Sequence, residues 1–271
     1  MTNWPHKGFW GIAALLAVLG CGQKQESSQR PEISVTNTYL QSAVADLTGG
    51  QMPIFCLTPP GMCPGHFDLS PEQNQQLLGS RILFRFDFQG GLDDKLRRME
   101  LQVVPIQGRA GLCIPQTYLD TCRDLLNRLS AEFPEMANSF AKRFETLETS
   151  LLEVSTEIRS RIEEAGLKGQ TVLASGHQVE FVRWLGLEAA AVFQGADSMT
   201  PSQIAQCLEA GRQAKVKIII ATLQEGAELP RRLAEQLNAR LVVFSNFPDL
   251  ATNAESRFVQ MLQNNINALI P

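Results

Sequence analysis

The sequence predicts an α/β protein of two lobes with parallel sheets, joined by a long and rigid helical linker. Short apolar runs alternate with helical segments in residues 32–115 and again in residues 166–271, which indicates βαβ units. Between these regions, residues 116–165 carry apolar side chains at helical spacing. The 271 residues of the chain are enough to build two lobes of this size.

The first residues have the features of a secretory signal. Lys7 precedes an apolar run over residues 9–19, which is about half the length of a membrane-spanning helix. The run ends before Cys21, and residues 18–21 resemble a lipobox, the signal at which bacteria attach lipid to a cysteine. We expect a signal peptide over residues 1–21 and lipidation of Cys21. The alternative is a signal peptide cut elsewhere, with Cys21 incidental, and both place the mature protein outside the cytoplasm.

A tether and the N-terminal lobe follow the signal. Residues 22–31 are polar and rich in Gln and Ser, which is typical of a flexible tether. In the lobe at residues 32–115, a helix is expected at residues 39–47, and Ser70 followed by Pro71 indicates the start of another. The strands are expected at residues 33–37, 52–57, 81–86 and 103–106.

The linker is expected over residues 116–165. Apolar residues recur three or four positions apart, as they do along one face of a helix. Pro134 is the one interruption, and we expect it in the first turn of a new helical segment. A helix of roughly 30 residues spans about 45 Å, which is enough to link two lobes.

The C-terminal lobe, residues 166–271, repeats the alternation of strands and helices. Residues 216–221 have the most hydrophobic pattern, as in a parallel strand that is buried on both faces. The strands are expected at residues 171–174, 189–193, 216–221 and 241–244, and the helices at residues 179–185, 200–213, 229–237 and 255–269.

Composition and missing motifs exclude several classes of function. Charged residues make up 19% of the chain, the net charge is -4 and there is no long basic stretch, so we expect no nucleic-acid partner. The sequence has no phosphate-binding loop, dinucleotide-binding pattern, Gly-x-Ser-x-Gly elbow or Cys-x-x-Cys pair. We therefore expect that the protein is not an enzyme. We interpret Asp93, Asp94 and Glu225 as solvated surface charges.

The mature chain has few histidines and an odd number of cysteines. His66 lies in a Pro/Gly-rich loop and His177 at the end of a strand, and no other histidine follows the signal peptide. Cys63 and Cys113 are either thiolate ligands, which favour zinc or cuprous copper, or members of a disulfide. We favour the disulfide and leave its pairing open. The possible partners of Cys63 and Cys113 are each other, Cys56 and Cys122.

Several stretches together resemble a known family. They are a first strand that ends in Tyr-Leu, a Pro/Gly-rich loop with a histidine, a Gly-Leu-Asp segment, a histidine before an aromatic residue, and a Thr-Pro-Ser helix start. They lie at residues 35–40, 59–71, 90–96, 175–187 and 200–202. Their order and spacing resemble those of the periplasmic metal-binding proteins of zinc and manganese ABC importers, the ZnuA-like group.

The resemblance implies a metal site between the lobes, with His66 and His177 in the places of two family ligands. The second family histidine is missing, and Cys113 is the one strong ligand in its region. In strict register, Ser245 or Asn246 takes the place of the family's acidic ligand, and Asp249 lies a few residues further on. The candidate metal ligands are therefore His66, His177, Asp249, Cys113 and Cys63.

The resemblance also implies a function. A helical-backbone (cluster A-I-type) solute-binding lipoprotein would capture a divalent transition metal in the interlobe cleft, zinc first and manganese next, and deliver it to an ABC permease. We expect a monomer in the periplasm or on the outer cell surface, anchored to the membrane through lipid on Cys21. Two alternatives stay open: an interaction or adhesion lipoprotein of the same fold without metal capture, and a thiol-dependent soft-metal binding protein.

Overall fold

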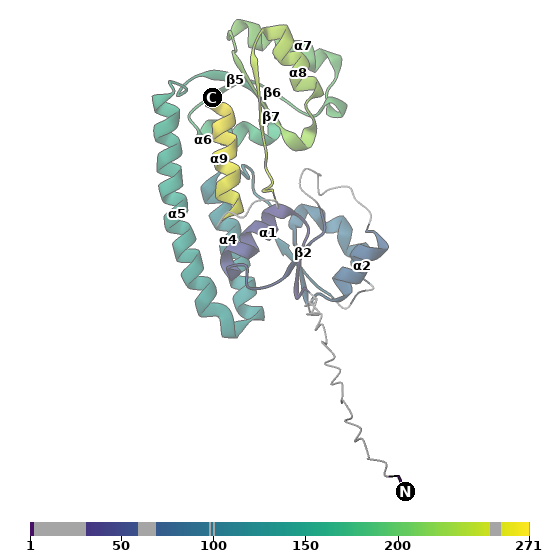
Figure 1. Ribbon diagram of the computed structural model, residues 1–271. Coiled ribbons are helices and arrows are strands. Elements are labelled where there is room, and N and C mark those ends of the chain that lie inside the picture. Colours follow the sequence, from purple (N-terminus) through teal and green to yellow (C-terminus); the bar gives the residue numbers. More distant parts are fainter. Residues whose placement is uncertain (3–30, 59–68, 98, 100, 250–255, 271) are drawn as a thin grey trace.

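The computed structural model describes residues 1–2, 31–58, 69–97, 99, 101–249 and 256–270 (Figure 1). Almost all of the expected signal peptide, the lipidation site Cys21 and the tether lie outside the described residues, as do Cys63 and His66. Within the described part of the chain, no helix is both long enough and apolar enough to span a bilayer.

The N-terminal lobe is built on a four-stranded sheet in the order β2-β1-β3-β4, with all strands parallel. The two central strands are buried along their whole length, as expected for a parallel sheet that helices cover. Its strands are β1 (Ile33–Val35), β2 (Ile54–Cys56), β3 (Ile82–Phe86) and β4 (Gln102–Ile106), and its helices are α1 (Thr38–Thr48), α2 (Pro71–Leu78) and α3 (Asp93–Leu96).

The C-terminal lobe has the same plan, with a parallel sheet in the order β6-β5-β7-β8. Its central strand β7 is buried at every position, which agrees with its continuous hydrophobic pattern. The strands are β5 (Thr171–Ser175), β6 (Glu188–Phe193), β7 (Ile218–Thr222) and β8 (Arg240–Phe244), and the helices are α6 (Val179–Trp184), α7 (Pro201–Gln213), α8 (Glu228–Leu237) and α9 (Arg257–Leu269). Two parallel α/β sheets confirm the predicted fold class.

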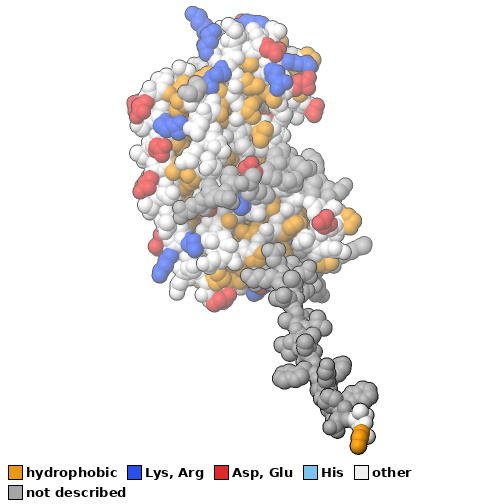
Figure 2. All heavy atoms as spheres, viewed as in Figure 1, with side chains coloured by type: hydrophobic (Ala, Val, Ile, Leu, Met, Phe, Trp, Pro, Cys, Tyr) orange, Lys and Arg blue, Asp and Glu red, His pale blue; other side chains and the backbone are white. Residues whose placement is uncertain are grey.

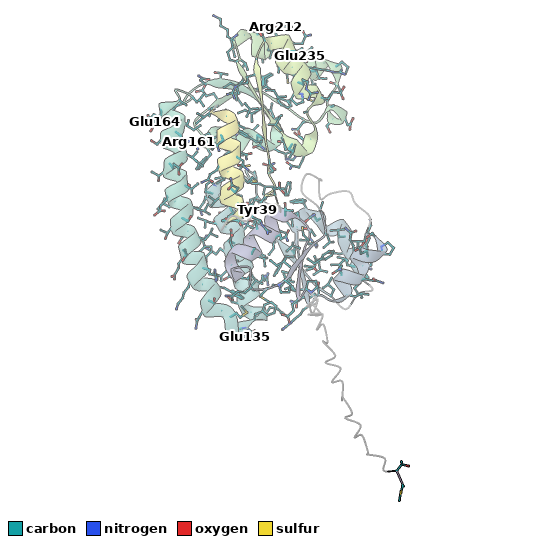
Figure 3. All side chains as sticks on the ribbon, viewed as in Figure 1. Tyr39, Glu135, Arg161, Glu164, Arg212 and Glu235 are labelled. Atoms are coloured by element: carbon teal, nitrogen blue, oxygen red, sulfur yellow. The ribbon has the colours of Figure 1, made fainter. Side chains whose placement is uncertain are left out.

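Two long helices, α4 (Pro115–Glu132) and α5 (Ala137–Glu164), lie between the lobes in the sequence. Pro134 follows α4 in a tight turn, because the residue before a proline is disfavoured in the helical region and Phe133 leaves it with φ -129° and ψ 68°. Helix α5 then runs along both lobes. Figure 3 labels Glu135, in the turn before the helix, and Glu164, its last residue. Its 28 residues correspond to about 42 Å.

Helix α9 returns from the C-terminal lobe to pack on α1 and α5 (Figure 1). Its Phe258 stacks on Tyr118 of α4, with ring centroids 3.8 Å apart, and meets Tyr39 of α1 edge-on at 5.9 Å. Tyr39 lies where α1 meets α9 (Figure 3). All three rings are fully buried, and they belong to one hydrophobic core that contains residues of both lobes.

Acidic and basic side chains are interspersed over the face of the molecule shown in Figure 2. Several charged side chains of the protein form ion pairs, either within one helix or between two. Arg123 of α4, for example, contacts Asp120 of the same helix at 3.0 Å and Glu148 of α5 at 3.4 Å. Because these pairs are exposed, each contributes at most about 1 kcal/mol to stability.

Candidate metal-binding site

Polar side chains gather where two neighbouring strands of the second sheet end. Strand β5 ends at Ser175 and leads into a short helix that carries His177, while β7 ends at Thr222 and leads into another that carries Glu225. The carboxyl ends of parallel strands lie at one edge of the sheet, so the two loops meet. As a result, Nε2 of His177 lies 3.6 Å from Oε1 of Glu225.

Ser175 fixes the geometry of this pair. Its hydroxyl donates to the other carboxylate oxygen of Glu225 and accepts the backbone N–H of His177 at 3.3 Å. The hydroxyl of Thr222 lies 2.9 Å from that of Ser175, and it is the donor, since the Ser175 proton is already used. Ser175 and Thr222 are buried, so the carboxylate is held by groups that have little freedom.

The two members of the pair differ in exposure. The side chain of His177 is 64% exposed, whereas that of Glu225 is only 16% exposed. An accessible imidazole beside an oriented carboxylate can receive a cation from solvent. The interpretation of Glu225 as a solvated surface charge is therefore wrong: the end of β7 places its carboxylate beside His177 and Ser175.

Cys113 lies elsewhere, at the contact between the lobes. Its thiol is fully buried, and the S–H donates to Oδ1 of Asn246 at 3.1 Å and to the carbonyl oxygen of Ser245 at 3.2 Å. Both acceptors lie just after β8. The amide of Asn265 on α9 donates to the sulfur at 3.6 Å. Burial raises the pKa of the Cys113 thiol well above its usual range, so the thiol stays protonated at neutral pH. It tethers the start of α4 to the C-terminal lobe.

The expected disulfide is wrong. Cys56, Cys113, Cys122 and Cys207 carry free thiols in the structure. Cys113 uses its S–H as a hydrogen-bond donor, and burial also raises the pKa of Cys122. The large shared core, rather than a covalent bridge, braces the first lobe. Cys63 lies outside the described residues.

A second group of polar side chains continues from Cys113 towards His177. The buried amide of Gln178 donates to Oδ1 of Asn246 at 2.9 Å, and the backbone N–H of Asn246 donates to Oε1 of Gln224 at 3.4 Å. The amide oxygen of Gln178 is buried and has no hydrogen-bond partner among the described residues. This group links the lobe contact to the His177 loop.

The remaining predicted ligands are not brought together by the described residues. Asp249 is exposed at the end of a described segment, a few residues beyond Ser245, and it has an interaction partner. His66 and Cys63 are outside the described residues. Among the side chains that the structure places, no three of His, Cys, Asp or Glu form a group that could hold a metal ion. The His177–Glu225 pair is therefore the part of the candidate site that the structure defines.

Glu225, Ser175 and the amides around Asn246 were not predicted from the sequence as members of the site. A usable signal existed, since Glu225 ends the short helix that follows the most hydrophobic strand, where parallel sheets place ligand-binding groups. The partnership of Cys113 with Asn246 and Asn265 could not be found in this way, because more than 130 positions separate them.

Two parallel α/β lobes, joined by helices and with polar loops at their meeting edges, define the class of two-lobed binding proteins. The family model described as the periplasmic component A of the zinc-uptake complex (ZnuA) matches residues 115–270, which is more than half of the chain. The protein belongs to this family. No curated protein matches the chain.

Solved structures show the same fold at low sequence identity. The manganese-bound periplasmic metal-binding protein from Candidatus Liberibacter asiaticus has a TM-score of 0.74 at 9% identity, covering 88% of this chain and 97% of that one. Its cadmium-bound form gives 0.74 at 10% identity with the same coverage. A mutant of the laminin-binding adhesin from Streptococcus agalactiae gives 0.72 at 12% identity, covering 88% and 98% of the two chains.

Proposed function

We propose that this protein captures a divalent transition metal outside the cytoplasm, zinc first and manganese next, and delivers it to an ABC permease as a carrier rather than an enzyme. The observation that supports this most is the His177–Glu225 pair, 3.6 Å apart at the carboxyl edge of the second sheet in a member of a metal-uptake family.

The chemistry of the pair suits such a cargo. Imidazole nitrogen and carboxylate oxygen are both ligands of zinc and manganese. Two donors bound to one tetrahedral ion at about 2.1 Å would lie about 3.4 Å apart, close to the separation between His177 and Glu225. The hydrogen bond from Ser175 fixes the orientation of the carboxylate, which is the role of groups that surround metal ligands.

The pair needs further donors, and His66 and Asp249 are the ones that we propose. Cys113 is a weaker candidate than its residue type suggests, because its proton is engaged and burial raises its pKa. Thiolate binding at Cys113 would require the loss of that proton and of the contact with Asn246. We therefore favour a site of nitrogen and oxygen donors over the thiol-dependent alternative.

Calorimetric titration of the metal-stripped chain of residues 22–271 with zinc and then manganese tests the proposal. We expect one ion per chain, and an affinity at least about 100-fold lower in His177→Ala and Glu225→Gln. Glu228→Gln is the matched control, since Glu228 is an exposed carboxylate of α8 that pairs with Arg232 away from the site. His66→Ala decides whether the loop histidine takes part. A parent protein that binds neither ion under reducing conditions would overturn metal capture.

A second candidate is an interaction or adhesion lipoprotein of the same fold without metal capture. Its supporting observation is that the strand ends carry neutral Ser175, Ser245 and Asn246, with no group of three potential ligands among the described side chains. The adhesin with a similar fold makes laminin a suitable probe. Retention of laminin by metal-free protein, together with no response to either ion, would favour this candidate.

Membrane anchoring is a separate part of the proposal. It rests on the lipobox-like residues 18–21 of the sequence. Cells that express the full chain and receive a radiolabelled fatty acid should label the parent protein and not Cys21→Ser, which should leave the membrane fraction. Equal labelling of both would contradict lipidation at Cys21.

A further inference from the structure

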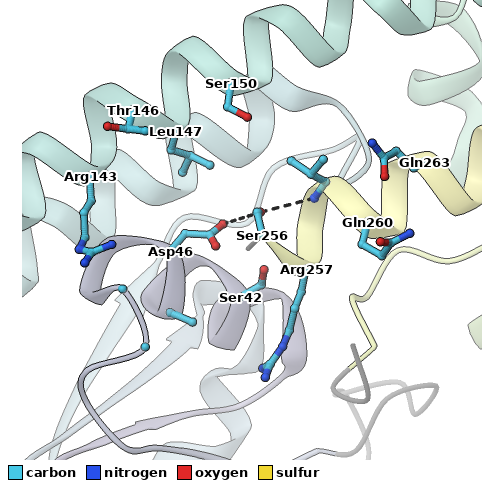
Figure 4. Close-up of a pocket in the computed structure, with 14 residues that line it drawn as sticks. Ser42, Asp46, Arg143, Thr146, Leu147, Ser150, Ser256, Arg257, Gln260 and Gln263 are labelled. Atoms are coloured by element: carbon cyan, nitrogen blue, oxygen red, sulfur yellow. Dashed lines mark hydrogen bonds between the residues drawn. The ribbon is translucent and has the colours of Figure 1, made fainter. Parts of the chain in front are cut away.

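A cavity of about 650 Å³ lies away from the His177 loop, between α1, α5 and α9 (Figure 4). It shares no lining residue with the candidate metal site. Its volume falls in the range of small-molecule sites, roughly 300–1,000 Å³. Since α1 belongs to the first lobe, α9 to the second and α5 to the linker, an occupant would contact all three parts of the molecule.

Two arginines line this cavity. The guanidinium groups of Arg143 on α5 and Arg257 on α9 make no hydrogen bond or ion pair with any side chain or carbonyl that the structure describes, and both residues are only partly exposed. Asp46, the acidic side chain between them in Figure 4, accepts the hydroxyls of Tyr118 at 2.7 Å and Ser256 at 2.8 Å. The described lining therefore carries two positive charges and one negative charge in a chain whose net charge is -4.

Each of the two arginines lies at the end of a helix, and the two ends differ in their effect on a positive charge. Arg143 lies against the C-terminal end of α1, where Gly49 has φ +65° and an added Cβ would fall 2.0 Å from the guanidinium carbon. The left-handed φ favours glycine at this position, and the missing Cβ leaves room for the guanidinium. Arg257 is the first residue of α9, where the helix dipole disfavours a positive charge. A positive charge is favourable at the C-terminal end of a helix, so the dipole of α1 accounts for the position of Arg143. The dipole of α9 does not account for Arg257.

The rest of the lining suits a polyhydroxylated molecule. Its polar groups include the hydroxyls of Thr146 and Ser150 and the amides of Gln260 and Gln263, and Leu147 and Val259 add apolar surface. We propose that this cavity binds an anionic sugar, with its carboxylate or phosphate held by Arg143 and Arg257 and its hydroxyl groups held by the serine, threonine and glutamine side chains. Guanidinium groups bind both anions through paired charge-assisted hydrogen bonds.

Calorimetry on the metal-stripped chain of residues 22–271 tests this inference with gluconate as the carboxylate, glucose 6-phosphate as the phosphate and glucose as the neutral control. We expect one of the two anions to bind and glucose not to bind. Arg143→Gln and Arg257→Gln should each weaken binding about tenfold, and the double variant about 100-fold, because each removes a charge-assisted contact.

The matched control is the double variant Lys142→Gln/Arg232→Gln, which removes the same two charges at exposed positions outside the cavity. It should bind the anion as the parent does, and so should His177→Ala, since the cavity is separate from the metal site. Circular dichroism verifies that each variant is folded. The inference is overturned if neither anion binds, or if the Arg143/Arg257 double variant binds as tightly as the control.

Discussion

Ser175 joins three groups at the end of β5. Its hydroxyl contacts Glu225, Thr222 and the backbone of His177, so one small side chain sets the orientation of both candidate ligands. Ser175 therefore orients the two candidate ligands and is not itself one of them. Its removal would leave the largely buried carboxylate of Glu225 with one donor fewer.

Ser175→Ala is therefore expected to weaken zinc affinity about tenfold, since groups that orient ligands typically contribute 10–100-fold. It should also lower the free energy of unfolding by about 1–2 kcal/mol, because Thr222 loses its acceptor. Calorimetric titration and urea unfolding measure the two effects. Ser160→Ala, on the exposed face of α5, is the control. Unchanged zinc affinity in Ser175→Ala would show that Glu225 needs no support from it.

The thiol of Cys56 provides a prediction on pH. Burial raises the pKa of Cys56 to about 12, and a backbone hydrogen bond at Thr58 opposes part of that rise. In the unfolded chain a thiol titrates near about 8.5. The unfolded state therefore loses this proton first, so the stability that the protonated thiol provides is complete below about pH 8.5 and is lost as the pH rises towards 12.

Urea unfolding of the parent protein and Cys56→Ala between pH 8 and 11 tests this linkage. The stability of the parent should fall more steeply with rising pH than that of the variant. Parallel slopes would mean that Cys56 is as accessible in the folded protein as in the unfolded chain.

Single residues also show what the sequence could reveal of the site. His177 was found because a histidine at a strand end is rare in this chain, and the structure places it beside a carboxylate. Cys113 was found for its residue type, but its burial and hydrogen bonds come from α9 and the segment after β8. Such long-range contacts depend on how the lobes pack, and no local pattern encodes that.

Among the elements, the capped helices followed most directly from the sequence. Thr200 and Ser70 each accept the backbone N–H of the third residue of their helix, and each is followed by a proline. Strand β2 is shorter than expected, at Ile54–Cys56, because only these residues pair with β1. The predicted final helix starts at Arg257 in the structure, after the N-cap Ser256.

Ser256 connects this last helix to the first lobe. Its hydroxyl oxygen accepts the N–H of Val259 at 3.5 Å, and its proton is donated to Asp46 of α1. Ser256→Ala removes both contacts and should destabilise the protein by about 1–2 kcal/mol. Urea unfolding measures the change, with Ser202→Ala, an exposed serine near the start of α7, as the control. Equal stability of the two variants would contradict a role for this cap.

At the scale of the whole molecule, the lobes share one core. Residues of both sheets, of α4 and α5, and of α9 belong to the same hydrophobic cluster. The sequence predicted the two sheets and the helical linker from local patterns. It did not reveal that α9 would pack between the lobes, because an amphipathic helix has the same pattern whichever surface it covers.

A shared core predicts that the lobes unfold together. Phe258→Ala should cost about 3–5 kcal/mol, as do other large-to-small changes of buried aromatic residues. Scanning calorimetry should show one transition, shifted to lower temperature, in both parent and variant. Leu152→Ala is the control, since this leucine of α5 is 70% exposed. Two separate transitions, with only one of them shifted, would show that the lobes are independent.

Helix α9 is synthesised after both sheets and after α4 and α5. Until it emerges, Tyr39 and Tyr118 lack the ring that packs against both of them, and the interior shared by the lobes stays open. A growing chain therefore cannot complete the shared core before α9 has been synthesised. An export system that requires unfolded polypeptide would therefore encounter a chain whose shared core is still incomplete.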